Sequence, residues 1–264
     1  MDSEWVPESV DLSKPSAARM YDYYLGGGHN FAVDREAAEK AIAAMPFTTT
    51  GARTNRAWLR RAVTYLCGAG MRQFLDLGSG VPTVGNVHEI AQTAAPEAKV
   101  VYVDVDPVAY EHARLLLADN DNASSVRADM RDVDRVLTAS AELLDLDQPV
   151  AVLMSAVLHF VPDSDRPAEI VAGYRDALVP GSYIALSHMS PIGRPAEELE
   201  RFQAVYKGAA NPVSLRDRAA IEPLLAGLEL VEPGLVKVPL WHPEDPPKPE
   251  HEDFPGYGVV GRKP

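Results

Sequence analysis

A short apolar strand that runs directly into two closely spaced glycines limits the folds open to this chain. Residues 74–80 read FLDLGSG, and a helical pattern follows. Glycine allows a sharp turn and a close approach of the backbone to a ligand, because it has no Cβ to clash. In open α/β sheets, ligands bind at the carboxyl ends of the strands. The segment therefore predicts an α/β fold with a binding site at Gly78 and Gly80.

Two kinds of nucleotide site use such a turn. A dinucleotide-binding loop has a third glycine three positions after the second, and here that position is Thr83, preceded by Pro82. Asp76, two residues before the first glycine, would repel a diphosphate and would suit an ammonium group. The segment favours a ligand with a positive charge, and a nicotinamide-dependent oxidoreductase is the alternative.

A second strand also ends in an acid. Residues 101–107 read VYVDVDP, so Asp104 lies at the tip of the strand next to the glycine turn. A carboxylate there can accept both hydroxyls of a ribose, through hydrogen bonds worth about 1.5–3 kcal/mol each. A solvated loop acid is the other interpretation. Asp106, which precedes a proline, is typical of a helix cap.

Two later strands end in residues suited to the same ligand. Asp129 and Met130 follow a predicted strand at 124–128, where the carboxylate could accept the adenine amine and the thioether could pack on the ring. Ser155 ends the next strand, beside the glycine turn. His159, four residues further on, is either a core or hinge histidine or a general base.

Alternating apolar strands and helices predict a parallel sheet covered on both faces. The predicted strands are 72–77, 99–103, 124–128, 150–154 and 182–187, and the predicted helices are 83–95, 107–119, a stretch ending near 144, 164–178, 195–208 and 214–226. Ser214 and Asp217 have the spacing of a capping box for the last helix. Strands at 235–241 and 257–262, with no helix between them, should pair antiparallel. We therefore expect a Rossmann-like, seven-stranded, mostly parallel sheet with a C-terminal antiparallel hairpin.

Three helices are predicted before the first strand, at 16–25, 34–45 and 55–67, with Asp34 capping the second. They suggest a helical cap over one end of the sheet. We therefore divide the chain into an N-terminal cap or lid at 1–70 and a main domain at 71–264.

Charge and composition exclude several functions. The net charge is −13, from 38 acidic and 25 basic residues, so nucleic-acid binding would need a local basic patch. Arg53, Arg56, Arg60 and Arg61 are the nearest to one, but they lie within an amphipathic helix pattern, which favours a solvated helix face. No apolar run reaches membrane length, no signal peptide is evident, and Cys67 is the only cysteine. We expect a cytoplasmic protein that binds no metal, nucleic acid or membrane.

Taken together, these motifs resemble a known family. Asp76, Gly78, Gly80, Asp104 and Asp129 are similar to the successive cofactor motifs of class I S-adenosylmethionine (SAM)-dependent methyltransferases, and the terminal hairpin is similar to their sheet. Within that class, the segments YDYYLGG (21–27), NFAVDRE (30–36) and TNRAWL (54–59) resemble a bacterial group called methyltransferase family 19. The resemblance extends from about residue 13 to 263.

The resemblance implies SAM as the cofactor. The residues it implies for SAM binding are Asp76, Gly78, Ser79, Gly80, Asp104, Val105, Asp129, Met130, Ser155 and Ala156. Gly78, Ser79 and Gly80 would line the methionine part, and Asp76 would face its amino group. Ser155 and Ala156 would pass beneath the cofactor near the sulfonium.

The resemblance supplies no methyl acceptor, and we expect a small molecule. The residues expected to form the substrate pocket, or to clamp the cofactor carboxylate, are Tyr21, Tyr24, Asn30, Phe31, Arg53 and Arg56. The tyrosines could equally be packing residues. An oxygen nucleophile would need a nearby base, for which His159 and His188 are candidates. A SAM-binding regulatory protein without catalysis is the remaining alternative.

Overall fold

The computed structural model describes residues 11–83, 85–209 and 211–264. Its strands are β1 (Gln73–Leu77), β2 (Lys99–Asp104), β3 (Ala123–Arg127), β4 (Ala151–Ser155), β5 (Tyr183–Met189), β6 (Glu229–Leu230), β7 (Val236–Lys237) and β8 (Gly256–Arg262). Its α-helices are α1 (Ala17–Tyr24), α2 (Ala32–Ala44), α3 (Thr48–Gly68), α4 (Val87–Ala94), α5 (Pro107–Leu116), α6 (Val133–Ser140), α7 (Pro167–Ala177), α8 (Ala196–Lys207) and α9 (Arg218–Ile221). Among these helices, none combines the length and the apolar character needed to cross a bilayer.

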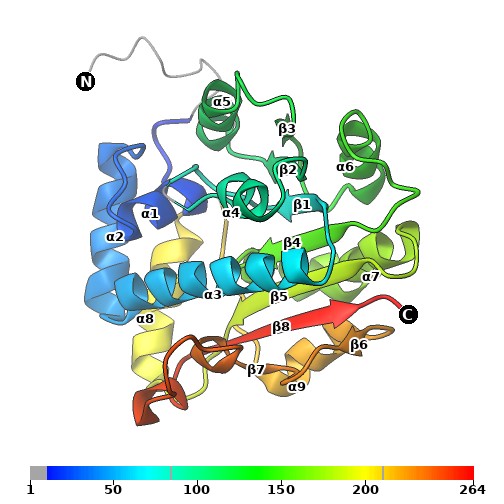
Figure 1. The fold of residues 1–264 in the computed structure, drawn as a ribbon. Coiled ribbons are helices and arrows are strands. Elements are labelled where there is room, and N and C mark those ends of the chain that lie inside the picture. Colours follow the sequence, from blue (N-terminus) through cyan, green and yellow to red (C-terminus); the bar gives the residue numbers. More distant parts are fainter. Residues whose placement is uncertain (1–10, 84, 210) are drawn as a thin grey trace.

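The strands form one sheet in the order β3-β2-β1-β4-β5-β8-β6, with β7 also paired to β8. The pairs β1–β2, β2–β3, β1–β4 and β4–β5 are parallel, and β8 runs antiparallel to β5. The order reverses at β1, since the chain first builds outward to β3 and then returns to β4 on the other side. In such sheets, ligands bind outside the carboxyl ends of the strands at the point of reversal. The predicted mostly parallel sheet with an antiparallel end is confirmed (Figure 1).

The last sheet position is shared by two short strands. Both β6 and β7 pair with the edge of β8 that β5 leaves free, β6 near Arg262 and β7 near Tyr257. The predicted strand 235–241 is therefore wrong beyond Lys237, where a 3₁₀ turn, η5 (Val238–Leu240), follows. Pro239 lies in this turn and has no N–H to extend the ladder. Eight strands thus occupy the seven predicted positions.

Helices cover both faces of the sheet (Figure 1). On one face, α3 and α4 pack against β1 and β2 around Trp58 and Phe74, both fully buried. On the other, α6, α7 and the 3₁₀ helix η4 (Glu222–Leu225) pack around Tyr174. These two apolar layers hold the sheet rigid, so its carboxyl edge is a fixed platform for a site.

A third apolar cluster joins the N-terminal helices to the second half of the chain. α1 and α2 pack against α8 through Met20, Ala38, Phe202 and Tyr206. α3 instead belongs mainly to the core of the sheet. The first ten residues of the predicted cap lie outside the described residues, and its boundary at residue 70 stays a prediction.

Several helix starts differ from prediction, and the largest difference is in α3, which is predicted from Asn55 and begins at Thr48. The predicted helix 83–95 begins at Val87, because Asn86 caps it and Glu89 accepts the Asn86 N–H. The predicted capping box at Ser214 is wrong, because α9 begins at Arg218 and Asp217 accepts the N–H of Ala220. Asp34, predicted as the cap of α2, lies inside its first turn and reaches back to the N–H of Phe31. Asp34 and Asp217 each stabilise a helix start, but from another position than their spacing suggested.

Candidate functional site

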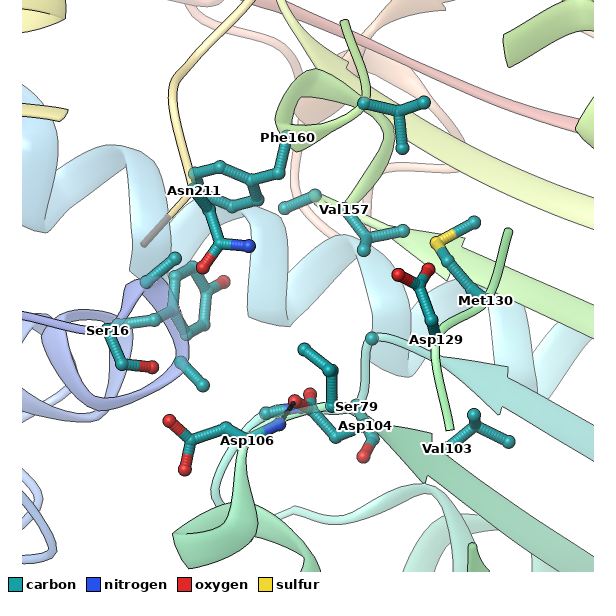
Figure 2. A pocket seen from close by; sticks show the side chains of 18 of the residues that line it. Ser16, Ser79, Val103, Asp104, Asp106, Asp129, Met130, Val157, Phe160 and Asn211 are labelled. Atoms are coloured by element: carbon teal, nitrogen blue, oxygen red, sulfur yellow. Dashed lines mark hydrogen bonds between the residues drawn. The ribbon is translucent and has the colours of Figure 1, made fainter. Parts of the chain in front are cut away.

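A cavity of about 620 Å³ lies at the carboxyl ends of β1, β2 and β4. All ten residues expected to bind a cofactor line it: Asp76, Gly78, Ser79, Gly80, Asp104, Val105, Asp129, Met130, Ser155 and Ala156. Figure 2 shows Asp129 and Met130 on one side of the cavity and Ser16 and Asn211 on the other. Its volume is in the range usual for small-molecule and cofactor sites.

The glycine turn after β1 is held against the loop after β4. Gly78 and Gly80 have φ angles of +66° and +68°, which side chains rarely adopt. A Cβ at Gly78 would lie 2.2 Å from Cγ2 of Val157, whereas one at Gly80 would meet nothing within 4 Å. Gly78 therefore lets two cavity walls touch, and Gly80 leaves space beside its backbone.

Asp104, at the end of β2, is tied to the glycine turn. Its Oδ2 accepts the N–H of Gly80 at 2.7 Å, and its Oδ1 accepts the N–H of Asp106 at 2.9 Å. Burial raises the pKa of Asp104 to about 6, against the lowering effect of these hydrogen bonds. The carboxylate therefore has a fixed orientation, and hydrogen bonds donated by a ligand would stabilise its charged form.

Asp76 is the more deeply buried acid, with 4 % of its surface exposed. Burial raises its pKa to about 7, and nearby Arg56 opposes this shift. Arg56 comes from α3, lines the same cavity, and donates to Thr83 Oγ1 at 3.1 Å. A buried carboxylate of this kind favours a cationic ligand, because a positive charge offsets the lost hydration.

Asp129 is already paired within the chain. Arg131 donates to it through Nε and Nη2, and also reaches Asp165 at 2.5 Å. The hydrogen bonds from Arg131 lower the pKa of Asp129. Met130 is held in place because the Tyr174 hydroxyl donates to its carbonyl at 2.7 Å. Asp129 therefore keeps its charge, and part of its hydrogen-bonding capacity is used.

Asn55 of α3 joins the ends of β4 and β5. Its amide donates to Ser155 Oγ at 3.1 Å and accepts from Ser187 Oγ at 2.6 Å. Ser187 Oγ in turn accepts the N–H of Ala156 at 2.9 Å. Sequence reasoning missed Asn55, although a polar residue on the apolar face of a helix was the available signal.

The structure brings only some of the expected substrate residues to a cavity. Tyr21 and Arg56 line the large cavity, and Tyr24 lines a smaller neighbouring one. The other three expected residues, Asn30, Phe31 and Arg53, line neither. Asn30 donates to Asp22 at 2.7 Å, Phe31 lies under the guanidinium of Arg19, and Arg53 is exposed on α3.

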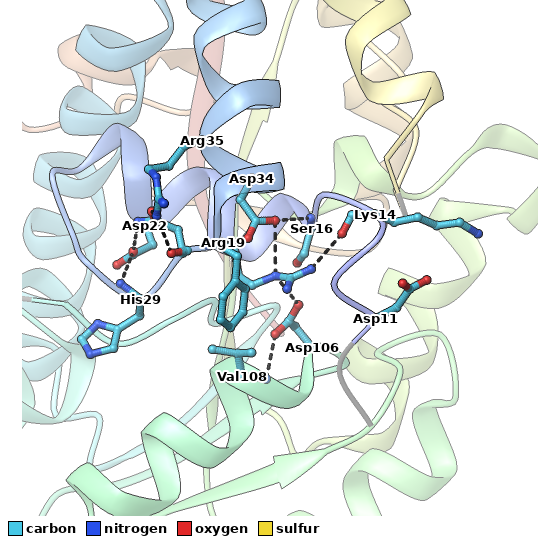
Figure 3. A network of polar contacts seen from close by, with 12 residues as sticks. Asp11, Lys14, Ser16, Arg19, Asp22, His29, Asp34, Arg35, Asp106 and Val108 are labelled. Atoms are coloured by element: carbon cyan, nitrogen blue, oxygen red, sulfur yellow. Dashed lines mark hydrogen bonds and ion pairs between the residues drawn. The ribbon is translucent and has the colours of Figure 1, made fainter. Parts of the chain in front are cut away.

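Arg19 on α1 is a cavity residue that the sequence analysis missed. It is 3 % exposed, and its Nε lies 3.4 Å from Asp34 and 3.5 Å from Asp106. Its Nη2 donates to the carbonyl of Lys14 at 3.1 Å. Figure 3 shows this guanidinium between an acid of α2 and the acid that caps α5. Arg19 thus links the N-terminal helices to the segment next to Asp104.

The two candidate bases differ in what their rings contact. Nδ1 of His188 lies 2.7 Å from the carbonyl of Met189, so it must carry the proton that it donates. Its Nε2 therefore accepts from Arg216 Nη1 at 2.9 Å. In contrast, Nδ1 of His159 is buried without a hydrogen-bond partner among the described residues. Burial lowers the pKa of both rings, so both are neutral near pH 7.

The described part of the chain was also searched for side chains that could bind a metal ion. No group of three or more His, Cys, Asp or Glu side chains there could hold a metal ion. The acids around the cavity instead come from separate segments of the chain, and they share the lining with the cationic side chains of Lys14, Arg19, Arg56 and Arg131.

Comparisons with known proteins point in one direction. The model of a family described as S-adenosyl methyltransferase matches residues 3–264. A proposed methyltransferase from Thermobifida fusca YX is 38 % identical, has a TM-score of 0.91, and the match covers 99 % of each chain. A DUF574 family protein from Streptomyces avermitilis MA-4680 is 41 % identical, with a TM-score of 0.90 and coverage of 96 % of this chain and 99 % of that one. The comparison with curated proteins found no match.

Proposed function

The chain belongs to the S-adenosyl methyltransferase family, and from this premise we propose that it transfers a methyl group from SAM to a small molecule by in-line displacement. One observation carries the proposal: residues from the ends of four neighbouring strands line a single cavity at the point where the strand order reverses. The family uses SAM as its cofactor. The roles of individual residues are our proposal.

The lining of the cavity fits SAM in its chemistry. Asp76 is a buried acid that a cationic amino group would stabilise in its charged form. Asp104 is fixed by two backbone N–H groups, and its remaining lone pairs can accept ribose hydroxyls. Gly80 leaves open space beside the backbone, as a bound ligand requires. Met130 offers an apolar thioether for an adenine ring.

The chain needs few reactive groups for this reaction. When bound, SAM supplies a methyl group on a positively charged sulfur, which is already an activated leaving group. The residues of the cavity then have to hold the two reactants in line and exclude water. Asn55, which fixes the ends of β4 and β5 together, keeps the wall at Ser155 and Ala156 rigid. We assign this wall to the reacting end of the cofactor.

Calorimetry with SAM tests the assignment of the cavity. We expect micromolar affinity for the parent protein, and at least about tenfold weaker binding for Asp104→Ala, which corresponds to ~1.4 kcal/mol. Asp121→Ala removes an equal charge from an exposed loop residue and should bind like the parent. Equal affinity of parent and Asp104→Ala would refute the ribose role.

Transfer itself needs a separate experiment. Purified protein is incubated with SAM labelled in the methyl group and with cell extract, and labelled compounds are identified by mass. We expect one small molecule to gain the label. A protein that binds SAM and S-adenosylhomocysteine comparably and labels nothing would instead be a catalytically silent binding protein.

A further inference from the structure

A second cavity, here called the side chamber, adjoins the large one. It measures about 80 Å³, and five residues line both spaces: Ala17, Tyr21, Asn55, Ala156 and Phe160. Figure 2 shows Phe160 at the wall of the large cavity. Ala156 belongs to the wall that we assign to the reacting end of SAM. The role of the side chamber rests on that proposed function, which places the chamber next to the methyl group of SAM.

The side chamber is uncharged and rich in rings. Seven of its lining side chains are Tyr or Phe, contributed by α1, α8, the 3₁₀ turn Leu158–Phe160 and the segments that precede α3 and β8. Among the described residues that line it, none is Asp, Glu, Lys or Arg. A carboxylate or an ammonium group entering this space would lose its hydration without gaining a partner of opposite charge, which is costly. The lining therefore selects a neutral group.

Almost every polar side chain of the lining is already hydrogen-bonded within the chain. The hydroxyls of Tyr24 and Tyr206 bond each other at 2.9 Å, and the Tyr21 hydroxyl donates to the Ala52 carbonyl at 3.1 Å. Thr48, Asn55, Ser187 and His188 also have partners. His159 is different, because its Nδ1 is buried without a partner among the described residues and the residue is 4 % exposed.

A ligand in the side chamber would give the buried Nδ1 of His159 the hydrogen-bond partner that it lacks among the described residues. A neutral imidazole has one donor and one acceptor nitrogen, and a buried polar atom left unpaired destabilises the folded state. Burial and the neighbouring His188 and Arg216 lower the pKa of His159, so its ring is neutral and one of its nitrogens can accept a hydrogen bond from a hydroxyl group. His188 cannot replace it, since both of its nitrogens are engaged.

We propose that the methyl acceptor is a neutral, hydroxyl-bearing ring compound whose reacting oxygen enters the side chamber and bonds to His159. The carbon–sulfur bond of SAM breaks with its electron pair left on sulfur, and the acceptor oxygen forms the new bond to the methyl carbon. His159 takes the hydroxyl proton, and S-adenosylhomocysteine and a methyl ether are the products.

The size of the side chamber sets the fit of the acceptor. An apolar cavity that holds benzene measures about 150 Å³, so the side chamber alone is too small for a whole ring. The ring must therefore extend past Tyr21 and Ala156 into the large cavity. This geometry places its hydroxyl end in the chamber and the rest of the molecule toward the cavity mouth.

Ligand-observed NMR titrations with simple probes test the proposal. Protein saturated with S-adenosylhomocysteine is titrated with phenol, toluene, benzoate and benzylamine. We expect phenol to bind about fivefold more tightly than toluene, on the scale of one hydrogen bond, and the two ionised probes to bind most weakly. In His159→Phe the preference for phenol over toluene should vanish. His112→Phe, which changes a histidine that lines neither cavity, should retain it.

The outcomes separate this inference from the proposed function. S-adenosylhomocysteine binding by each variant shows that it is folded, and His159→Leu replaces His159→Phe if the latter does not fold. Failure of the parent protein to bind S-adenosylhomocysteine would refute the proposed function itself. If the cofactor product binds, then equal affinity for phenol and toluene, or tight binding of benzoate or benzylamine, overturns the acceptor class. A labelled product methylated on nitrogen would do the same.

Discussion

Asp76 carries a charge that the SAM-free protein disfavours. Its pKa is about 7 in the folded chain, against about 3.9 in an unfolded one. Between these values the folded state holds a proton that the unfolded state has released, so the free energy of unfolding falls as pH rises from about 4 to 7. Asp104, with a pKa raised to about 6, acts in the same direction.

The first prediction concerns Asp76→Asn. The variant should unfold less readily than the parent at pH 8 by roughly 1–3 kcal/mol, because it removes a buried charge, and its stability should vary less with pH. Its affinity for SAM should fall at least about tenfold, since the amino group loses its counter-charge. Urea unfolding from pH 5 to pH 8 and calorimetry at pH 8 measure the two effects. A variant less stable than the parent at pH 8 would show that the carboxylate is satisfied within the chain.

Gly78→Ala is the second prediction. The new methyl group would overlap the side chain of Val157, which lies 2.2 Å from the ideal Cβ position. We expect a loss of about 2–4 kcal/mol in the free energy of unfolding, from the overlap together with the positive φ. Gly234→Ala has a similar φ of +81° but meets no atom within 4 Å, so it reports the backbone strain alone. Equal losses in urea unfolding for the two variants would mean that the contact with Val157 is soft.

Periodicity identified most elements because each strand and helix has an apolar face that must be buried. The sheet, its covering helices and the carboxylates at the strand ends follow from short segments such as 74–80 and 101–107. The predicted site residues come together because parallel strands end at one edge. Periodicity does not show which helices and loops from distant parts of the chain pack against that edge of the sheet.

The missed residues all act across long sequence separations. Asn55 bonds Ser155 and Ser187, which are 100 and 132 residues away. Arg19 meets Asp106 through the packing of α1 beside α5. No local pattern encodes such pairs, and a buried arginine in a helix looks the same in sequence as an exposed one. The error at 235–241 is of the same kind, because Trp241 turns inward to pack against Trp58 and Tyr65.

Arg216 fixes the loop that follows β4, and this gives the third prediction. Its guanidinium is 4 % exposed and donates to the carbonyls of Leu158 and Val161, to Asp163 and to His188. Arg216→Met should lower the free energy of unfolding by about 2–4 kcal/mol, because buried carbonyls lose charged donors.

Arg114→Met is the matched control, since that side chain is 57 % exposed and pairs only with Glu111 among the described residues. It should change stability by less than about 0.5 kcal/mol. Urea unfolding measures both variants. Equal stability of Arg216→Met and Arg114→Met would contradict the prediction. It would mean that water replaces Arg216 as the donor to the carbonyls of Leu158 and Val161.

The N-terminal helices form part of the wall of the large cavity. α1 supplies Ala17, Arg19 and Tyr21 to the cavity lining and packs on α2 and α8. Arg19 is the polar link between this layer and the strand edge, because Asp34 belongs to α2 and Asp106 caps α5 (Figure 3). Its Nη1 has no hydrogen-bond partner among the described residues.

The fourth prediction is that Arg19→Met loosens this layer. Two buried acids would lose their shared cation, and breaking such a pair is costly because the remaining charges stay buried. The amide hydrogens of α1 should exchange faster, and SAM should dissociate at least about tenfold faster with a smaller change in its association rate. Hydrogen exchange followed by mass spectrometry and stopped-flow fluorescence measure the two effects.

Lys40→Met separates a specific link from a general effect of lost charge on the N-terminal helices. Lys40 lies on α2, is exposed, and pairs with Glu36 across one helical turn at 2.8 Å, an interaction worth only a few tenths of a kcal/mol. In Lys40→Met, the amide hydrogen exchange of α1 and the dissociation rate of SAM should match those of the parent protein. If Arg19→Met released SAM at the parental rate while α1 exchanged faster, the N-terminal helices would open without gating the cavity. The cofactor would then be retained by the strand-end residues alone, and the predicted lid would be only a packing layer.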